Sequence, residues 1–229
     1  NSLLDARGIK KQQQFLLMGS RLVKEALRLH PQKFSELIVP VGYEEGVAAP
    51  DLDHYILEKP LFKELDVYGT QSPILVGNTP ALPETDLQSA PQGLELLVAT
   101  GDPSNLGALL RSAKAFSASK ITLLKECAHP FHPKCLRSSS GAVLNLDLQS
   151  GPSIQDVVPQ PSVYSLDSSG ESLHNFSWPK DLRLVIGEEG LGVPKHLVDA
   201  NTLSIPMNSE LESLNAMVAA GISMYSYRQ

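Results

Sequence analysis

Short, almost entirely apolar segments alternate with helix-like segments through the second half of the chain. Residues 94–99, 121–124 and 182–186 are predicted strands that leave little polar surface for water. Strands that are apolar along their whole length are typical of parallel sheets covered by helices on both faces. The sequence therefore predicts an α/β fold with a mostly parallel sheet. Further strands are expected at 142–148, 162–166 and 202–205.

Helices are expected between these strands, at 104–116, 133–140 and 194–200. Asp102 or Ser104 would cap the first of them. A long apolar helix should close the chain, with Ser209 or Asn208 as its cap and Glu212 completing a capping box from Ser209. Ser213 and Asn215 would then lie inside an apolar helix, where each needs a hydrogen-bond partner.

The first half is expected to be a separate, smaller α/β unit. A helix is predicted at 12–30, strands at 34–39, 53–57 and 74–76, and a helical turn at 59–65. Residues 78–93 are rich in Pro, Asn, Ser and Gln, which is typical of a linker. The sequence therefore predicts a small α/β domain over residues 1–88, with a Pro-rich linker at its end, and a second domain over 89–229.

Charge is distributed unevenly along the chain. The net charge is −6, yet residues 1–35 and 101–140 each carry more basic than acidic side chains. A phosphate backbone responds to such local fields rather than to the overall charge. The plainer interpretation, that these are solvated helix faces, stays open for the first segment.

Several classes of protein are disfavoured by composition. The apolar stretches are far too short to span a bilayer, and Cys127 and Cys135 form neither a disulfide framework nor a metal-ligand pattern. His129 and His132 bracket two residues in a loop but have no second ligand cluster. We therefore expect a cytoplasmic protein with no membrane span and no metal.

Three polar segments follow predicted strands or open predicted helices, where chemistry can be placed. Residues 102–107 join a strand to a helix, the position at which open α/β sheets bind ligands. Residues 187–192 hold three glycines around two glutamates, which is typical of a tight turn or of a backbone lying against a ligand. Ser213 to Asn215 form the third segment. Taken singly, each of the three is also compatible with an ordinary turn, cap or satisfied core residue.

Together, the three segments resemble the motifs of the SpoU (TrmH-type) RNA 2′-O-ribose methyltransferases of the SPOUT class. The first motif resembles Asp102, Pro103, Asn105, Gly107, Ala108, Arg111 and Ala113; the second Gly187, Glu189, Gly190 and Gly192; the third Ile205, Pro206, Met207, Ser213, Leu214 and Asn215. An intermediate segment, Pro133 to Ala142, is similar as well. The resemblance covers residues 92–229 well and the N-terminal part more loosely. Ser104, Ser117, Glu188 and Ala216-Met217 depart from the family pattern without removing a polar group that the chemistry needs.

The resemblance implies a catalytic domain with a C-terminal trefoil knot, S-adenosylmethionine as methyl donor, an RNA substrate and an obligate homodimer. It implies catalytic roles for Arg111, Asn105, Glu189, Ser213 and Asn215. It implies donor contacts at Leu166, Gly187, Ile205, Met207 and Leu214. The RNA contacts that we expect are Lys10, Lys11, Arg21, Lys134, Arg137 and Ser139.

The implied reaction is methyl transfer to a ribose 2′-hydroxyl of structured RNA, with ribosomal RNA preferred over tRNA. Two alternatives stay open at this point. The chain could bind RNA without transferring a methyl group, or it could methylate a base or a small molecule instead of a ribose.

Overall fold

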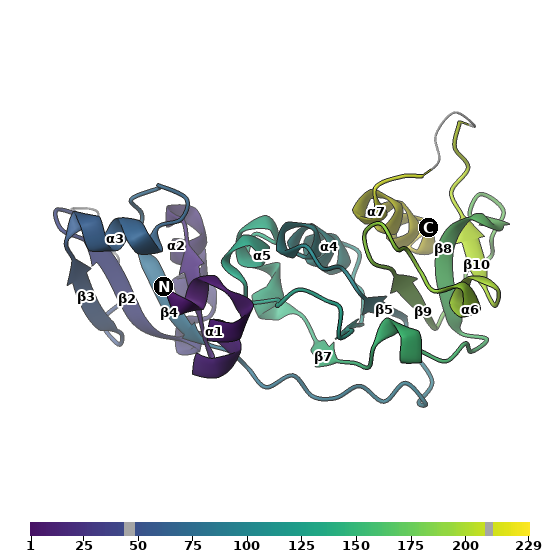
Figure 1. The fold of residues 1–229 in the computed structure, drawn as a ribbon, viewed down its shortest axis with the longest axis horizontal. Coiled ribbons are helices and arrows are strands. Elements are labelled where there is room, and N and C mark those ends of the chain that lie inside the picture. The colour runs from purple at the N-terminus through teal and green to yellow at the C-terminus, as the bar shows by residue number, and fades with distance from the viewer. Residues whose placement is uncertain (44–48, 209–212) are drawn as a thin grey trace.

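The computed structural model describes residues 1–43, 49–208 and 213–229, and its strands form two separate sheets (Figure 1). The larger sheet has the order β10-β8-β9-β5-β6-β7, and every neighbouring pair in it is parallel. The predicted mostly parallel α/β sheet is therefore confirmed. Its strands are β5 (Leu94–Val98), β6 (Lys120–Leu123), β7 (Leu148–Ser150), β8 (Val163–Ser172), β9 (Leu182–Ile186) and β10 (Thr202–Ser204).

Alternate residues of the central strand β5 point to opposite faces of this sheet. Each face is covered by other elements, so the sheet has a core on both sides. Leu96 and Val98 of β5 pack in one core with α4 (Pro103–Ala115), α5 (Pro133–Ser138) and α7 (Ala216–Tyr227). Leu97 and Ala99 pack in another with residues of α6 (Lys195–Val198) and of the 3-10 turn η4 (Ile154–Asp156). Burial on both faces explains why β5 and β9 are apolar apart from the paired Glu95 and Arg183.

Helices α4 and α5 cross closely at Gly107. A Cβ built on Gly107 would lie 1.9 Å from Ser138 Oγ and 2.5 Å from the Cys135 carbonyl oxygen. No larger residue fits without separating the two helices. The glycine of the first motif is therefore needed for packing, whatever it does in the site.

The smaller sheet has the order β1-β4-β2-β3 and is mixed. Strand β4 (Ile74–Asn78) is antiparallel to both β1 (Gln14–Met18) and β2 (Phe34–Pro40), and β3 (Asp53–Leu57) is parallel to β2. The remaining elements of this part are η1 (Ser2–Leu4), α1 (Ala6–Gln12), α2 (Ser20–Leu29), η2 (Pro31–Lys33) and α3 (Lys59–Leu65).

Four expectations for helices and strands are wrong. The helix predicted at 12–30 is instead α1, β1 and α2, because Gln13 has a left-handed φ of 54° and the run from Phe15 to Met18 is a buried strand paired with β4. A short apolar run fits either period, and sheet pairing decides it here. The strand predicted at 142–148 is the 3-10 turn η3 (Ala142–Asn145) followed by β7. Strand β8 continues six residues beyond its predicted end at Leu166.

The fourth error concerns the start of the last helix. Helix α7 begins at Ala216 with Asn215 as its N-cap, not at Asn208 or Ser209. The proposed capping box from Ser209 to Glu212 lies outside the described residues. Ser213 and Asn215 therefore precede the helix, and the expectation of buried polar residues within it is incorrect.

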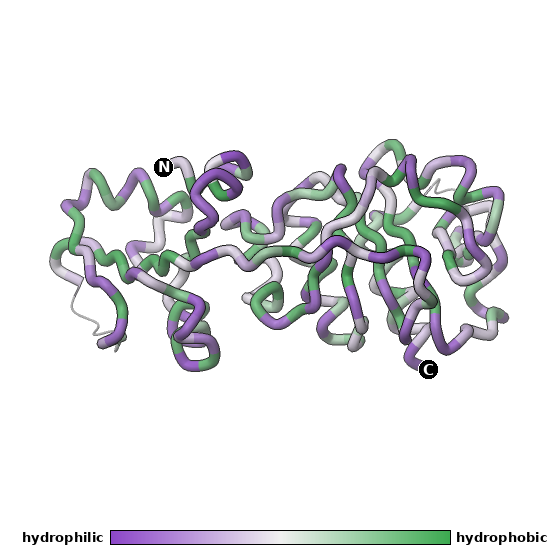
Figure 2. The backbone as a smooth tube through the Cα atoms, turned by 90° about the horizontal axis from the view of Figure 1, so that it is seen from below, coloured by the Kyte–Doolittle hydropathy of each residue, from purple (hydrophilic) through white to green (hydrophobic). Residues whose placement is uncertain are grey.

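The segment between β4 and β5 is fastened to the larger sheet along its length (Figure 2). The Thr85 amide donates to the Ser150 carbonyl at 2.8 Å, and the Ser150 amide donates to the Pro83 carbonyl at 2.9 Å. Further along, Arg183 donates to the carbonyl oxygens of Leu87 and Ser89 at 2.9 and 2.8 Å. The composition predicts a Pro-rich linker here, and the structure shows that this segment is a strap that adds to the edge of β7.

Arg183 is the anchor of this strap and is itself deeply buried. Its side chain is 1% exposed, and its Nε donates to Glu95 Oε2 at 2.9 Å, with Glu95 2% exposed. Lys120 Nζ reaches the other carboxylate oxygen of Glu95 at 3.3 Å. The pair joins the neighbouring strands β5 and β9 and holds the strap against them.

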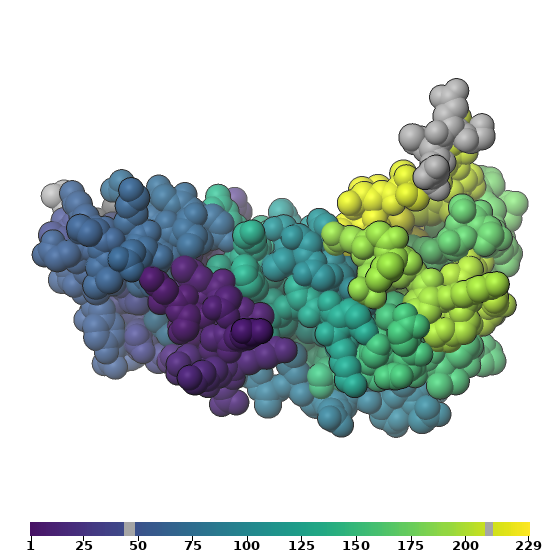
Figure 3. Space-filling view, in the orientation of Figure 1, coloured from purple at the N-terminus to yellow at the C-terminus, as the bar shows by residue number. Residues whose placement is uncertain are grey.

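The N-terminal part packs on α5 and the loop before it (Figure 3). The Phe15 and Phe131 ring centroids are 4.9 Å apart, and the Arg137 guanidinium lies 4.0 Å from the centre of the Tyr68 ring. In the same loop, the Phe131 amide donates to His129 Nδ1 at 3.2 Å. Burial, together with the nearby cations Lys10 and His132, lowers the pKa of His129 to about 4.

We predict that Arg183→Met destabilises the chain by about 3–5 kcal/mol, because it leaves the Glu95 carboxylate buried without its main partner. Adding Glu95→Leu should recover part of this loss, since an apolar pair needs no charge compensation. Urea unfolding followed by the fluorescence of Trp178, the single tryptophan of the sequence, measures both values. A loss below about 1 kcal/mol in the single variant would contradict the anchoring role.

We also predict that His129 makes stability depend on pH. The unfolded chain binds this proton near pH 6.5, whereas the folded chain binds it only near pH 4. The contribution of neutral His129 is therefore complete above about pH 6.5 and is lost as the pH falls toward 4. His129→Asn keeps an acceptor for the Phe131 amide and does not titrate. Melting temperatures of the two proteins should converge as the pH falls through this window, and parallel curves would refute the prediction.

Candidate functional site

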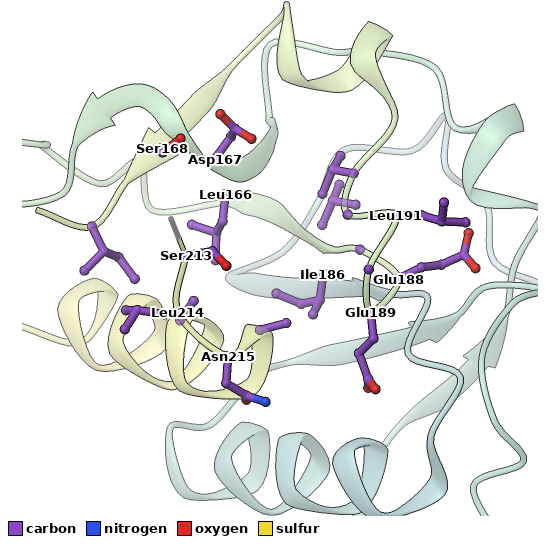
Figure 4. Close-up of a pocket in the computed structure, with 18 of the residues that line it drawn as sticks. Leu166, Asp167, Ser168, Ile186, Glu188, Glu189, Leu191, Ser213, Leu214 and Asn215 are labelled. Atoms are coloured by element: carbon purple, nitrogen blue, oxygen red, sulfur yellow. The ribbon is translucent and has the colours of Figure 1, made fainter. Parts of the chain in front are cut away.

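A pocket of about 610 Å³ opens at the carboxyl ends of β8, β9 and β10, beside the start of α7 (Figure 4). Its size lies within the usual range for a site that takes a small molecule or cofactor. All five residues expected to contact a donor line it: Leu166, Gly187, Ile205, Met207 and Leu214. Three of the five expected catalytic residues line it as well, namely Glu189, Ser213 and Asn215.

The glycine turn after β9 forms one wall. Glu188 and Gly192 exchange two backbone hydrogen bonds, of 3.1 and 2.8 Å, which close the turn on itself. A Cβ on Gly187 would lie 2.3 Å from the Gly192 carbonyl oxygen, so the closed turn admits only glycine at that position. Leu191, at the tip, is 81% exposed. The turn thus presents backbone to the pocket on its inner side and an apolar side chain to solvent.

A bulge in β8 forms the opposite wall. Ser165 pairs with Thr202, but the next pair joins Glu171 to Leu203, so residues 166–170 loop out of the ladder. The bulge carries Leu166, Asp167 and Ser168 into the pocket lining. Figure 4 shows Asp167 and Ser168 on the side of the pocket away from Glu189 and Asn215.

Asp167 and Ser168 were missed by the sequence analysis. Asp167 Oδ1 accepts hydrogen bonds from the amide and the hydroxyl of Ser169, at 2.9 and 2.7 Å. An Asp followed two residues later by Ser is the signal that could have located this turn. It was overlooked because the strand was expected to end at Leu166.

The third wall is the segment that leads into α7. Asn215 Oδ1 accepts hydrogen bonds from the amides of Met217 and Val218, at 2.9 and 3.4 Å. This cap fixes where the helix begins and leaves Ser213 and Leu214 before the helix, in the lining of the pocket. The partner that Asn215 needs is therefore the first turn of its own helix.

A side-chain contact joins the first motif to the second. Asn105 Nδ2 donates to Glu189 Oε1 at 2.8 Å, across 84 residues of sequence. Asp102 positions Asn105 by capping α4, since its Oδ1 accepts from the amides of Ser104 and Asn105, both at 2.8 Å. Glu189 engages one N–H of the Asn105 side-chain amide, and the oxygen of the same amide adds an acceptor to this junction.

Arg111 is the expected catalytic residue that does not line the pocket. It is exposed on α4, and within the described residues it makes no ion pair. It lies almost two helical turns beyond Asn105, about 9 Å along the helix axis. A guanidinium in this position is free to meet an anion that approaches from outside.

The expected RNA contacts fall into two groups. Lys10, Lys11, Arg21 and Lys134 are exposed. Arg137 is exposed but stacks on Tyr68. Ser139 is only 1% exposed and donates its hydroxyl to the Leu136 carbonyl, which contradicts its expected contact with RNA. Its hydroxyl is instead used inside the turn that ends α5.

Other chemistries find little support in the described ranges. No group of three or more His, Cys, Asp or Glu side chains there is arranged to hold a metal ion. Burial raises the pKa of the Cys127 thiol to about 12 and also raises that of Cys135, so both stay protonated and unreactive. In the same ranges, every helix is too short or too polar to cross a bilayer.

The profile of the SpoU rRNA methylase family matches residues 96–225. The chain is 39% identical, over 98% of its length, to the ribosomal RNA small subunit methyltransferase G 2 of Syntrophobacter fumaroxidans, of which it spans only 46%. It is 30% identical, over 93% of its length, to the 23S rRNA (guanosine(2553)-2′-O)-methyltransferase RlmP of Bacillus subtilis and covers 88% of that protein.

Solved structures share the fold over nearly the whole chain. A TrmH-family protein from Porphyromonas gingivalis superposes with a TM-score of 0.78 at 27% identity, covering 99% of this chain and 94% of that one. The SpoU methyltransferase AviRb of Streptomyces viridochromogenes, in complex with its cofactor AdoMet, superposes with a TM-score of 0.81 at 23% identity, with the same coverage. The fold therefore extends through the N-terminal part as well as the larger sheet.

We predict that Gly187→Ala opens the glycine turn and destabilises the chain by about 1–3 kcal/mol, because the added methyl group collides with backbone. Gly101→Ala is the matched control, since the nearest neighbour of its Cβ position, the Glu126 carbonyl oxygen, lies at 3.8 Å, an ordinary contact distance. That substitution should be neutral or stabilise by up to about 1 kcal/mol. Thermal unfolding followed by Trp178 fluorescence compares the two, and equal melting temperatures would show that the turn is not closed as described.

Proposed function

Because the chain belongs to the SpoU rRNA methylase family, we propose that it transfers a methyl group from S-adenosylmethionine to a ribose 2′-hydroxyl of structured RNA. Ribosomal RNA is the favoured substrate, since the Bacillus subtilis relative, which the chain covers almost completely, is a 23S rRNA 2′-O-methyltransferase. Such a substrate also favours a cytoplasmic location.

One observation carries the proposal: two motifs far apart in sequence line a single pocket, and a third is hydrogen-bonded to its rim. The bulge of β8, the glycine turn and the segment before α7 surround it, and the Asn105–Glu189 hydrogen bond ties the first motif to its rim. An ordinary β–α turn or a lone helix cap would not require this convergence.

The pocket suits a donor of the size and mixed polarity of S-adenosylmethionine. Apolar side chains such as Leu166, Ile205 and Leu214 line it together with the glycine turn at 187–192. Carboxylates of Asp167 and Glu189 lie on its lining and would favour the cationic parts of the donor. When bound, the donor supplies a methyl group activated by its sulfonium centre.

The residues of this chain would position the acceptor. Glu189 holds the Asn105 amide, whose free oxygen is placed to accept a hydrogen bond from a ribose hydroxyl or a guanidinium. Arg111 stays protonated under nearly all conditions, so its role is to orient a nucleotide phosphate and to stabilise developing negative charge rather than to act as a base. Ser213 and Asn215 shape the opposite lip of the pocket.

We also propose that two copies of the chain assemble through α7. Val218, Ile222 and Tyr225 form an apolar stripe along this helix and are 51%, 39% and 55% exposed. Tyr225 also packs edge-on against Phe116 at the end of α4, which places the stripe beside the helix that carries Arg111. Since Arg111 does not line the pocket of its own chain, a second copy is the natural source of the guanidinium at each pocket.

The proposal also gives each of the two expected domains a role. Residues 1–88 would form the RNA-binding domain, which is supported by the exposed Lys10, Lys11 and Arg21. Residues 89–229 would form the catalytic domain with its trefoil knot, which is supported by family membership.

We predict that Arg111→Ala lowers the rate of methyl transfer by about 10²- to 10³-fold, as expected for the loss of one preorganised donor. Affinity for S-adenosylmethionine, measured by calorimetry, should change by a small factor only. The assay is mass spectrometry of nucleosides from ribosomal RNA incubated with protein and donor. A 2′-O-methylated nucleoside is expected, and a methylated base or no product at all would reject the proposed reaction.

The same variants test the assembly. Glu189→Ala should also be inactive, because it releases Asn105 and alters the pocket. Mixed with Arg111→Ala and allowed to exchange subunits, it should regain up to about a quarter of wild-type activity, because about half of the dimers are then mixed and each mixed dimer has one intact composite site out of two. No recovery despite proven exchange would mean that each chain uses its own Arg111.

A further inference from the structure

A second cleft lies between α2 and the turn η3, on the boundary between the N-terminal part and the larger sheet. Its volume is about 190 Å³, and we call it the α2–η3 cleft. Leu22, Leu29 and Leu144 supply apolar walls, and Glu25, His30 and Asn145 supply polar groups. The cleft is separate from the donor pocket and shares no lining residue with it.

We propose that the α2–η3 cleft holds one unstacked nucleobase of the RNA substrate, a few nucleotides away from the ribose that is methylated. This inference rests on the proposed function, because it assumes an RNA substrate bound at the donor pocket. The RNA sequence would then be recognised at a cleft whose lining residues come from α2 of the N-terminal part and from residues 140–145.

The size and chemistry of the cleft suit a base. Its volume is well below the 300–1,000 Å³ typical of a cofactor site and leaves room for one flat ring system. Apolar walls on opposite sides, from α2 and from η3, match the way proteins sandwich an extruded base. Carboxylate, amide and imidazole groups provide both donors and acceptors, which is what reading a base edge requires.

His30 carries an unsatisfied buried atom at this cleft. Its Nε2 is buried and lacks a hydrogen-bond partner among the described residues. Burial, reinforced by Lys33, lowers the pKa of its imidazole. A neutral imidazole offers one donor and one acceptor, so it pairs with a base edge rather than with a phosphate. A buried polar atom of this kind usually has a function or a missing partner.

Positive charge surrounds the cleft where a backbone would pass. On α2, Arg21 lies one helical turn before Glu25 and Arg28 almost one turn after it, and all three are exposed. On the other side, Lys114 Nζ donates to the carbonyl of Asn145 at 3.3 Å. The phosphates on either side of a bound base would therefore meet cations.

Helix α4 links the cleft to the donor pocket. Asn105, at its start, contacts Glu189 on the rim of the donor pocket, and Lys114, in its last turn, contacts Asn145 of the cleft. Arg111 lies between them, about one turn from Lys114. An RNA strand that follows the exposed side of α4 would thus pass from the base site to Arg111 and, in the proposed dimer, from Arg111 to the donor pocket of the second copy.

Photo-crosslinking of thiouridine-containing fragments of ribosomal RNA to the full chain tests this inference. Crosslinked peptides, identified by mass spectrometry, should include residues 22–30 or 140–145. Two variants should lower the yield at these peptides by about fivefold or more, the lower limit expected for losing one base contact. They are Ala142→Phe, which fills the cleft, and Asn145→Ala, which removes an exposed polar group without touching the core.

The matched control is Ala200→Phe, which places the same side chain at an exposed alanine outside both pockets. It should leave the crosslinks unchanged, and Trp178 fluorescence should confirm that all three variants are folded. Crosslinks confined to other peptides, or yields unaffected by Ala142→Phe and Asn145→Ala, would overturn the inference.

Donor binding and methyl transfer, measured on the same preparations, separate this inference from the proposed function. If the wild-type chain methylates ribose while the crosslinks avoid the cleft, only the inference fails. If the crosslinks map to the cleft while no ribose is methylated, the proposed function fails and the cleft remains a site for an RNA base.

Discussion

The buried pair of Arg183 and Glu95 holds together three parts of the molecule that are far apart in sequence. It connects the two central strands of the larger sheet and fastens the strap that arrives from the N-terminal part. A buried ion pair gives little net stability, because desolvation offsets most of the attraction. The pair mainly determines geometry. The Arg183 guanidinium donates to Glu95 and to the carbonyl oxygens of Leu87 and Ser89, so the strap can follow only one path.

The donor pocket depends on backbone more than on side chains. A bulge in β8, a closed glycine turn and an asparagine cap each set the course of one segment, and the three courses meet at the carboxyl edge of the sheet. Polar side chains lie at the rim of the pocket, where Asn105 donates a hydrogen bond to Glu189. Because the backbone shapes the pocket, glycine and capping residues are prominent in the motifs.

Elements that produce a local pattern of apolar residues could be predicted from the sequence. Strands β5 and β9 and helix α4 could be predicted because burial leaves an unmistakable apolar run or face. Pairing between distant segments could not be predicted from local patterns, so β1 read as helix and the far half of β8 was missed. The pocket residues came from the resemblance of the motifs, whereas Asp167 and the α2–η3 cleft require the tertiary structure. The same is true of the burial of Ser139, which no local signal reveals.

The strap between the two sheets has a consequence for how changes in chain length are tolerated. From Pro83 to Ser89 its carbonyl and amide groups are engaged by β7 and Arg183. Extra residues inserted within that stretch would break several contacts at once, whereas those added just after Asn78 would form a loop and leave the contacts intact. The strap therefore has a fixed length between β7 and β9, and it can follow only one course along the larger sheet.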